Sequence, residues 1–214
     1  VMITGDHPET ALAIAKKLHI ANGFADVRTG AQLDALSDSE FLSTAEHACV
    51  FARVTPAHKL KIVRALKKSG HIVAMTGDGV NDAPAVKEAD IGVSMGKNGT
   101  DVTREASGIV LLDDDFSTLV SAVEEGRIIY QNIRKFIRYL LSCNIGEVVT
   151  MFFGMLMGMP VVLLPIQILM VNLVTDGIPA IALSFDPPQD DVMKERPRGR
   201  GDSVFSGGLA ATII

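Results

Sequence analysis

Two aspartates, Asp78 and Asp82, stand in a glycine-rich stretch at residues 76–85. The β-branched, apolar run 71–75 before it predicts a buried strand, and the Ala/Lys/Glu-rich segment after it predicts a helix. Glycines at such a turn let the backbone approach a ligand closely, and two carboxylates there can hold Mg²⁺ beside a phosphoryl group. The alternative is an ordinary strand-to-helix turn in which Asp82 caps the helix.

A second set of polar side chains lies in an almost uncharged part of the chain, and every member offers an oxygen atom. Its members are Asn144, Glu147, Asn172, Thr175 and Asp176. The spacing places the first two on one helix face and the last three on another. A carboxylate in hydrocarbon is costly unless it is paired or binds a cation, so the two acids predict a cation site. Oxygen ligands favour a hard cation such as Ca²⁺. Asn144 and Thr175, each taken alone, also fit ordinary interhelical hydrogen bonding.

Composition divides the chain into two parts. Of its 214 residues 48% are hydrophobic, and residues 1 to about 135 mix charged and apolar types, whereas 136–185 is almost uncharged. The net charge of −5 argues against nucleic acid as a partner, because phosphate backbones bind basic faces. The two cysteines, Cys49 and Cys143, are too few and too scattered for a disulfide framework or a metal cluster.

The first part alternates strand-like and helix-like segments, which predicts an α/β fold with a parallel sheet and flanking helices. Strands are expected at 49–54, 71–75, 91–95 and 108–112. Asp6 is expected to cap a helix, and Pro56 to open another. In open α/β sheets ligands bind beyond the carboxyl ends of the strands. Four polar residues fall at such ends and are expected to converge there: Thr4, Asp6, Arg53 and Asp78.

The second part predicts a helical hairpin that crosses a membrane. We expect a stalk helix at 116–138, membrane helices at 139–160 and 165–185, a cytosolic loop at 186–206 and the start of another membrane helix at 207–214. Basic residues beside the spans place the stalk and the loop on the cytoplasmic side. Gly177 and Pro179 are expected to loosen the second helix beside Asp176 and to free carbonyl ligands.

Five motifs carry a resemblance to one family. Residues 76–85 resemble the hinge motif of P-type cation-transporting ATPases, whose phosphorylation domain has the haloacid-dehalogenase (Rossmann-like) fold. The other four motifs, also in the family's order, are Thr4-Gly-Asp6, Phe51-Ala-Arg-Val54 with Pro56 and Lys59, Asn144-Ile-Gly-Glu147 and Val171-Asn-Leu-Val-Thr-Asp-Gly177. The last two resemble ion-binding helices of calcium pumps of the sarcoplasmic-reticulum type. By this resemblance residues 1–115 are the C-terminal part of the phosphorylation domain, and the spans are membrane helices five and six.

The resemblance also implies residue roles and cofactors. Thr4 and Gly5 would hydrogen-bond the phosphoryl group that ATP donates, Lys59 would neutralise its charge and Asp78 would bind Mg²⁺. Asn81 and Asp82 would steady the site, and the phosphate-binding set would comprise Thr4, Gly5, Asp6, Arg53 and Lys59. The transported ion would be Ca²⁺.

One essential part of such a pump is missing from the sequence. The family forms an aspartyl-phosphate on an Asp-Lys-Thr-Gly-Thr motif, and that string does not occur here. We therefore expect a fragment that is inactive alone and that works with the lipid bilayer, the transported cation and the remaining domains of the same pump. The alternatives are a pump for Na⁺ or Mn²⁺, a soluble phosphohydrolase of the same superfamily, and a truncated membrane module without catalysis.

Overall fold

The first of two units, Val1–Thr118, is built on short parallel strands in the described part of the chain. The computed structural model describes residues 1–188, 191–199 and 201–205. One sheet has the order β1-β3-β2, with β1 at Met2–Ile3, β2 at Val27–Thr29 and β3 at Val50–Ala52. The other has the order β4-β5-β6, with β4 at Ala74–Gly77, β5 at Ile91–Met95 and β6 at Ile109–Leu111.

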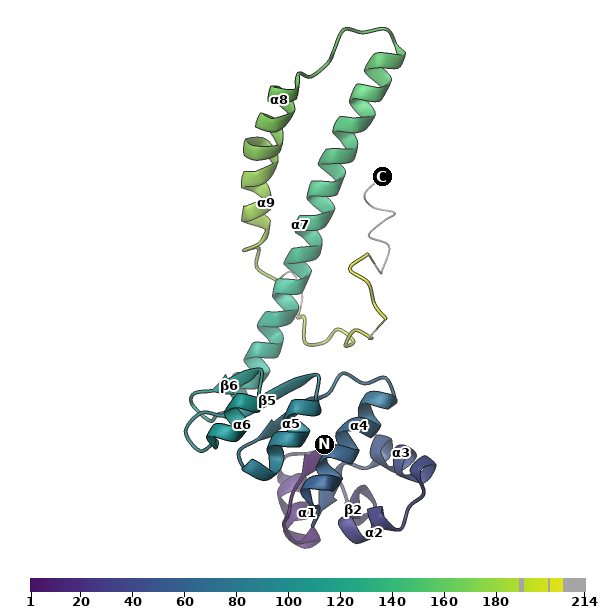
Figure 1. Cartoon of the computed structure of the whole chain (residues 1–214), viewed down its shortest axis with the longest axis vertical. Coiled ribbons are helices and arrows are strands. Elements are labelled where there is room, and N and C mark those ends of the chain that lie inside the picture. Colours follow the sequence, from purple (N-terminus) through teal and green to yellow (C-terminus); the bar gives the residue numbers. More distant parts are fainter. Residues whose placement is uncertain (189–190, 200, 206–214) are drawn as a thin grey trace. The chain divides into compact units, whose positions relative to one another are not determined.

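Helices connect and cover these strands (Figure 1). They are α1 (Pro8–Lys17), α2 (Gly30–Asp34), α3 (Asp38–His47), α4 (Pro56–Lys68), α5 (Ala83–Glu88) and α6 (Asp101–Ala106), with 3-10 turns η1 (Phe24–Asp26) and η2 (Val80–Asp82). The predicted α/β class with parallel strands and flanking helices is therefore confirmed. The strands form two three-stranded sheets, with no ladder joining them in the described residues.

Two local expectations were wrong. His7, and not Asp6, is the N-cap of α1, because the Asp6 amide donates to Thr4 Oγ1 at 3.1 Å and the chain is still extended at His7. The strand expected at 71–75 begins only at Ala74. The amide and carbonyl of Val73 are instead bonded to the turn at Asp90.

The core of this unit lies where α4 packs on both sheets. Phe51 of β3 and Ile62 of α4 are fully buried in one cluster, and Val63 of the same helix packs with Met75 of β4 in another. Ile3 of β1 touches both clusters. Burial of these side chains removes apolar surface from water at about 25 cal/mol per Å². It therefore holds the carboxyl ends of β1 and β4 on the same helix.

The start of α4 is fixed by a buried histidine. Thr55 Oγ1 accepts from the His58 amide at 3.3 Å, and the Thr55 amide donates to His58 Nδ1 at 3.1 Å, which forms a capping box. His58 Nε2 lies 2.8 Å from Asp34 Oδ1 of α2. These bonds set the direction in which α4 leaves β3, and with it the position of the next residue, Lys59.

The second unit, Leu119–Ile214, is a helical hairpin in its described residues. Its first arm belongs to α7 (Phe116–Leu156), and its second arm consists of α8 (Pro165–Met170), the π-helical η3 (Val171–Asp176) and α9 (Gly177–Leu183), which run alongside α7 in Figure 1. The two described segments Phe116–Leu156 and Pro165–Leu183 are long and apolar enough to cross a membrane.

The helix α7 ends at Leu156, before the expected limit at residue 160. Gly158 has a φ of 71°, and the Met159 amide donates back to the Gly154 carbonyl at 3.0 Å. A left-handed glycine of this kind caps and ends a helix.

Residues after the second arm bind the charged, N-terminal half of α7. Asn132 Nδ2 donates to the Ser184 and Asp186 carbonyls at 3.3 and 2.8 Å, and Lys135 forms an ion pair with the Asp186 carboxylate. Arg127 Nη1 donates to the carbonyls of Val192 and Glu195 at 2.7 and 3.0 Å.

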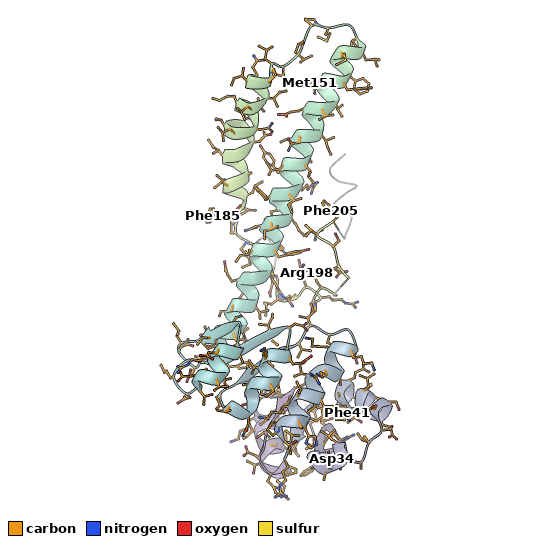
Figure 2. All side chains as sticks on the ribbon, viewed as in Figure 1. Asp34, Phe41, Met151, Phe185, Arg198 and Phe205 are labelled. Carbon is orange, nitrogen blue, oxygen red and sulfur yellow. The ribbon has the colours of Figure 1, made fainter. Side chains whose placement is uncertain are left out.

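The same segment contacts α7 through a cation–π pair, because the Arg198 guanidinium lies 3.3 Å from the centre of the Tyr130 ring. Arg198 is labelled in Figure 2. Within the loop predicted at 186–206, residues 189–190, 200 and 206 lie outside the described residues, as does the further helix predicted at 207–214. The domain boundaries remain predictions.

Candidate functional site

A cavity of about 320 Å³ opens at the carboxyl ends of β1 and β4. Its polar lining comes from the two strand ends and from α4 and η2. The lining residues are Ile3, Thr4, Gly5, Lys59, Met75, Thr76, Gly77, Asp78, Asp82 and Met95. Five of the residues predicted from the sequence are therefore brought together: Thr4, Gly5, Lys59, Asp78 and Asp82.

A buried ion pair forms one wall of this cavity. Lys59 Nζ donates to Asp82 Oδ1, and the two side chains are only 16% and 10% exposed. Gly77 makes this approach possible, since a Cβ there would lie 2.5 Å from the Cβ of Asp82. Asp82 is consequently a partner for Lys59 and does not cap α5 with its side chain.

Asp78 differs from Asp82 in its surroundings. Its side chain is exposed at the cavity, and in the described residues its carboxylate has no hydrogen bond or ion pair, while its carbonyl accepts from the Thr100 amide at 2.9 Å. A free carboxylate beside the hydroxyl of Thr4 and the ammonium of Lys59 is a suitable ligand for Mg²⁺ next to a phosphoryl oxygen.

Three predicted residues do not line the cavity: Asp6, Arg53 and Asn81. Arg53 has a left-handed φ of 50°, which is uncommon outside glycine, and its amide donates to the Asp6 carbonyl at 3.1 Å. Asn81 is exposed on η2. The bond between the Arg53 amide and the Asp6 carbonyl therefore joins the segments that follow β3 and β1, but the side chains of Asp6, Arg53 and Asn81 do not line the cavity.

The loop after β5 is held by one carboxylate. Asp114, with a φ of 61°, accepts from the amides of Gly96, Lys97 and Asn98 at 2.7–2.9 Å. Hydrogen bonds from these amides, that of Lys97 foremost, lower the pKa of the Asp114 carboxyl below its ordinary value. Sequence reasoning did not identify this clamp, which fixes the loop that follows Met95 at the cavity.

In the second unit, an acid and an amide are bonded between the arms of the hairpin, and a second acid is buried on the second arm. Asn172 Nδ2 of η3 donates to Glu147 Oε2 of α7 at 3.3 Å. Asp176 is only 4% exposed. Within the described residues, Asp176 Oδ2 and Glu147 Oε1 are buried oxygens without a hydrogen-bond partner. Such unpaired oxygens in an apolar hairpin are suited to a cation.

The backbone beside Asp176 is loosened at the predicted place. Pro179 has no amide hydrogen, and its ring crowds the carbonyl of Thr175 four residues earlier. The helix widens into the π-helical η3 before Gly177. The Thr175 carbonyl then accepts from the hydroxyl of Tyr139 at 3.4 Å.

The other two predicted cation ligands do not join this cluster. Asn144 is exposed and donates to the Leu140 carbonyl of its own helix at 2.8 Å, and the Thr175 side chain is exposed. Sequence reasoning missed Tyr139 and set Cys143 aside as a lone cysteine, although both lie on the same helix face as Glu147 at four-residue intervals. The four-residue spacing could have indicated from the sequence that these side chains share a helix face with Glu147. Among the described residues, no three side chains of His, Cys, Asp or Glu are close enough to hold a metal ion at once.

Comparison with known proteins gives matches for both units. Residues 1–90 match the family described as haloacid dehalogenase-like hydrolase, and residues 160–214 match the family described as cation transporting ATPase, C-terminus. A solved structure titled as the catalytic domain of the CPx-ATPase CopB-B aligns with a TM-score of 0.42 and 28% identity, over 56% of this chain and 37% of that chain.

Curated relatives match along the whole chain. The calcium-transporting ATPase of Bacillus subtilis (strain 168) is 58% identical over 214 residues, which are 100% of this chain and 24% of the relative. The endoplasmic reticulum calcium ATPase srcA of Aspergillus fumigatus is 53% identical over 213 residues, which are 98% of this chain and 22% of the relative. The chain thus spans about a quarter of the length of these relatives. The hydrolase family matches the part of the chain with the phosphate-site motifs, and the cation-transporting family matches the part with the last ion-site motif. Together with the relatives that match along the whole chain, this shows that the chain belongs to the P-type cation-transporting ATPases.

Proposed function

We propose that the protein to which this chain belongs is an ATP-driven Ca²⁺ pump that forms an aspartyl-phosphate intermediate. The single observation that carries the proposal is Asp176, a carboxylate buried in an apolar hairpin with an oxygen that has no hydrogen-bond partner in the described residues. The names of the relatives support Ca²⁺ as the transported ion. The chain supplies part of the phosphoryl site and part of the cation site.

The phosphoryl site needs a nucleophile that this chain does not contain. Within the described residues, β1 and β4 each lie at the end of a sheet with one edge unpaired, and Ile3 of β1 packs in the same cluster as Met75 of β4. A parallel strand from the rest of the protein fits these two edges, and its carboxyl end would open on the cavity. We infer that this strand carries the phosphorylated aspartate.

Around that aspartate, the residues of the chain bind and neutralise the phosphoryl group. The Thr4 hydroxyl and the Gly5 amide donate to its oxygens, and the Lys59 ammonium, held by Asp82, offsets its negative charge. The unpaired carboxylate of Asp78 fits Mg²⁺, which when bound stabilises negative charge on phosphoryl oxygens. Because Asp82 is already paired with Lys59, Asp78 is the main magnesium ligand from this chain.

The cation site uses Glu147, Asn172 and Asp176 of the hairpin. All three offer oxygen, which suits Ca²⁺. Asn144 and Thr175 complete the set only when other membrane segments pack on their exposed faces, so we assign them a secondary role. In this proposal the hairpin crosses the bilayer and the first unit lies in the cytoplasm.

The experiment is phosphoenzyme formation by the full-length protein in membranes. Labelled ATP is added with Ca²⁺, Mn²⁺ or Na⁺, and acid-stable label is counted for the parent, Glu147→Gln, Asp176→Asn and the control Glu125→Gln, an exposed acid of α7 without a hydrogen bond or ion pair in the described residues. We expect Ca²⁺ to trigger labelling, and Glu147→Gln and Asp176→Asn to need roughly tenfold more Ca²⁺ or to fail.

Two other outcomes would overturn parts of the proposal. Labelling that follows Mn²⁺ or Na⁺ but ignores Ca²⁺ would keep the pump and change its ion. No labelling with any cation would favour a membrane module without catalysis.

A further inference from the structure

A thiol lies beside the acids of the hairpin. Cys143 is followed by Glu147 after one helical turn of α7, so the two side chains share a face. The residues one turn before and one turn after Cys143 on this face both bond to the second arm: the Tyr139 hydroxyl donates to the Thr175 carbonyl at 3.4 Å, and Glu147 Oε2 accepts from Asn172 Nδ2 at 3.3 Å. The Cys143 thiol also interacts with the Tyr139 hydroxyl and the Asp176 carboxylate. Cys143 therefore lies on the face of α7 that bonds to η3.

A second observation points to a ligand at the same place without reference to the cysteine. Asp176 is 4% exposed, and its Oδ2 has no hydrogen-bond partner in the described residues. Glu147 Oε1 is unpaired in the same way. Two buried carboxylate oxygens that lack donors lower their free energy by binding a positive charge, and the thiol of Cys143 interacts with one of these carboxylates.

We propose that Cys143 is a ligand in this cation site and that the site therefore binds thiophilic divalent cations, with Cd²⁺ as the representative. The inference rests on the proposed function only in using Glu147 and Asp176 as cation ligands. Cd²⁺ resembles Ca²⁺ in size and charge but prefers sulfur, whereas Ca²⁺ gains little from it. One sulfur among carboxylates thus shifts the selectivity of the site towards softer ions.

The unliganded geometry indicates how such an ion would be held. Cys143 interacts with Asp176 through space, whereas Glu147 is bonded to Asn172 at 3.3 Å, a long hydrogen bond. Since no three acid or thiol groups of the described residues converge at present, the ion would be held first by Cys143 and Asp176. The Glu147 side chain would then turn from Asn172 to become the third ligand.

The test is equilibrium binding of radioactive Cd²⁺ to the purified full-length protein. The variants are Cys143→Ser, which replaces sulfur by oxygen with little change in shape, Asp176→Asn, and the control Cys49→Ser in the first unit. We expect Cys143→Ser and Asp176→Asn each to weaken Cd²⁺ binding roughly tenfold or more, while Cys49→Ser binds as the parent does. Equal binding by the parent and Cys143→Ser, or no binding by the parent, would overturn the proposal.

A second readout separates this inference from the pump proposal. In the same preparations, the ratio of the half-effective Cd²⁺ and Ca²⁺ concentrations is measured in the phosphoenzyme assay, and Cys143→Ser should raise it roughly tenfold. If Ca²⁺ triggers labelling but the ratio is unchanged, the role of Cys143 is wrong and the pump stands. If Cd²⁺ binding depends on Cys143 and Asp176 but no cation triggers labelling, the metal site stands and the pump fails.

Discussion

Lys59 of α4 and Asp82 of η2 form an ion pair in the wall of the cavity, although they are 23 positions apart in the sequence. Both side chains are largely buried, so each depends on the other for its charge to be compensated. The pair joins the helix that crosses both sheets to the turn that carries Asp78. It therefore links the stability of the first unit to the geometry of its candidate site.

The first prediction concerns this pair. Lys59→Ala leaves the buried Asp82 carboxylate without its partner, and we expect a loss of about 3 kcal/mol in the free energy of unfolding. Urea unfolding of the chain in detergent measures it. Arg64→Gln is the control, because the pair of Arg64 with Glu88 is more exposed and should cost less than about 1 kcal/mol. Equal losses in the two variants would contradict the role given to the pair.

The second prediction concerns Asp78. Asp78→Asn keeps the size of the side chain but removes its charge, so the Mg²⁺ concentration that half-saturates phosphoenzyme formation should rise roughly tenfold. The matched control is Asp101→Asn, because Asp101 lies outside the cavity and pairs with Arg104. An unchanged Mg²⁺ requirement in Asp78→Asn would remove Asp78 from the magnesium site.

The third prediction is a pH dependence at Asp114. Its pKa lies below the ordinary value of about 3.9 because loop amides donate to it, so the folded state stabilises the carboxylate form. This contribution is complete above the ordinary pKa and is lost as the pH falls through the lower pKa of the folded state. Hydrogen exchange of the peptide containing residues 96–98 should thus be slow in the parent at pH 5 and above, and fast in Asp114→Ala.

Asp113→Ala is the control for that experiment, since Asp113 accepts from Thr118 and Asp115 and not from the loop at 96–98. As the pH is lowered below about 4, the difference between the parent and Asp114→Ala should shrink. If the difference in exchange rate between the parent and Asp114→Ala instead grows as the pH is lowered, the predicted pH dependence is contradicted.

The fourth prediction concerns the segment that follows the second arm of the hairpin. Arg127→Gln removes the donors to the Val192 and Glu195 carbonyls, so trypsin should cleave after Lys194 and Arg198 several times faster. Arg138→Gln changes an exposed arginine of the same helix that has no hydrogen bond or ion pair in the described residues. If both variants are cleaved at the parent's rate, the contacts of Arg127 do not hold this segment.

The fold was predictable where local pattern and burial agree. The apolar run at 91–95 is β5 with its predicted bounds, because it is flanked by turn residues and most of it is buried. Gly177 and Pro179 correctly indicated a distorted helix, since the loss of an amide hydrogen is a local property. The helix α3 was missed although Ser37 and Glu40 form a capping box that is readable in the sequence.

The candidate sites were predictable in part. Strand ends brought Thr4 and Asp78 to one cavity, as the carboxyl-end rule predicts. The pairing of Lys59 with Asp82 and of His58 with Asp34 depends on how α4 packs, which no local pattern encodes. Cys143 was set aside because it has no second cysteine nearby in sequence, but its partners are oxygen groups that approach through space.

The central claim is that Asp176 binds the ion that the intact protein transports, and ATP-driven uptake of radioactive Ca²⁺ into sealed vesicles tests it most directly. The full-length parent, Asp176→Asn and the control Glu125→Gln are compared at equal protein content. We predict ATP-dependent uptake by the parent and the control, and a reduction of roughly tenfold or more in Asp176→Asn. Uptake by Asp176→Asn at the parent's rate and with the parent's Ca²⁺ dependence would contradict the account.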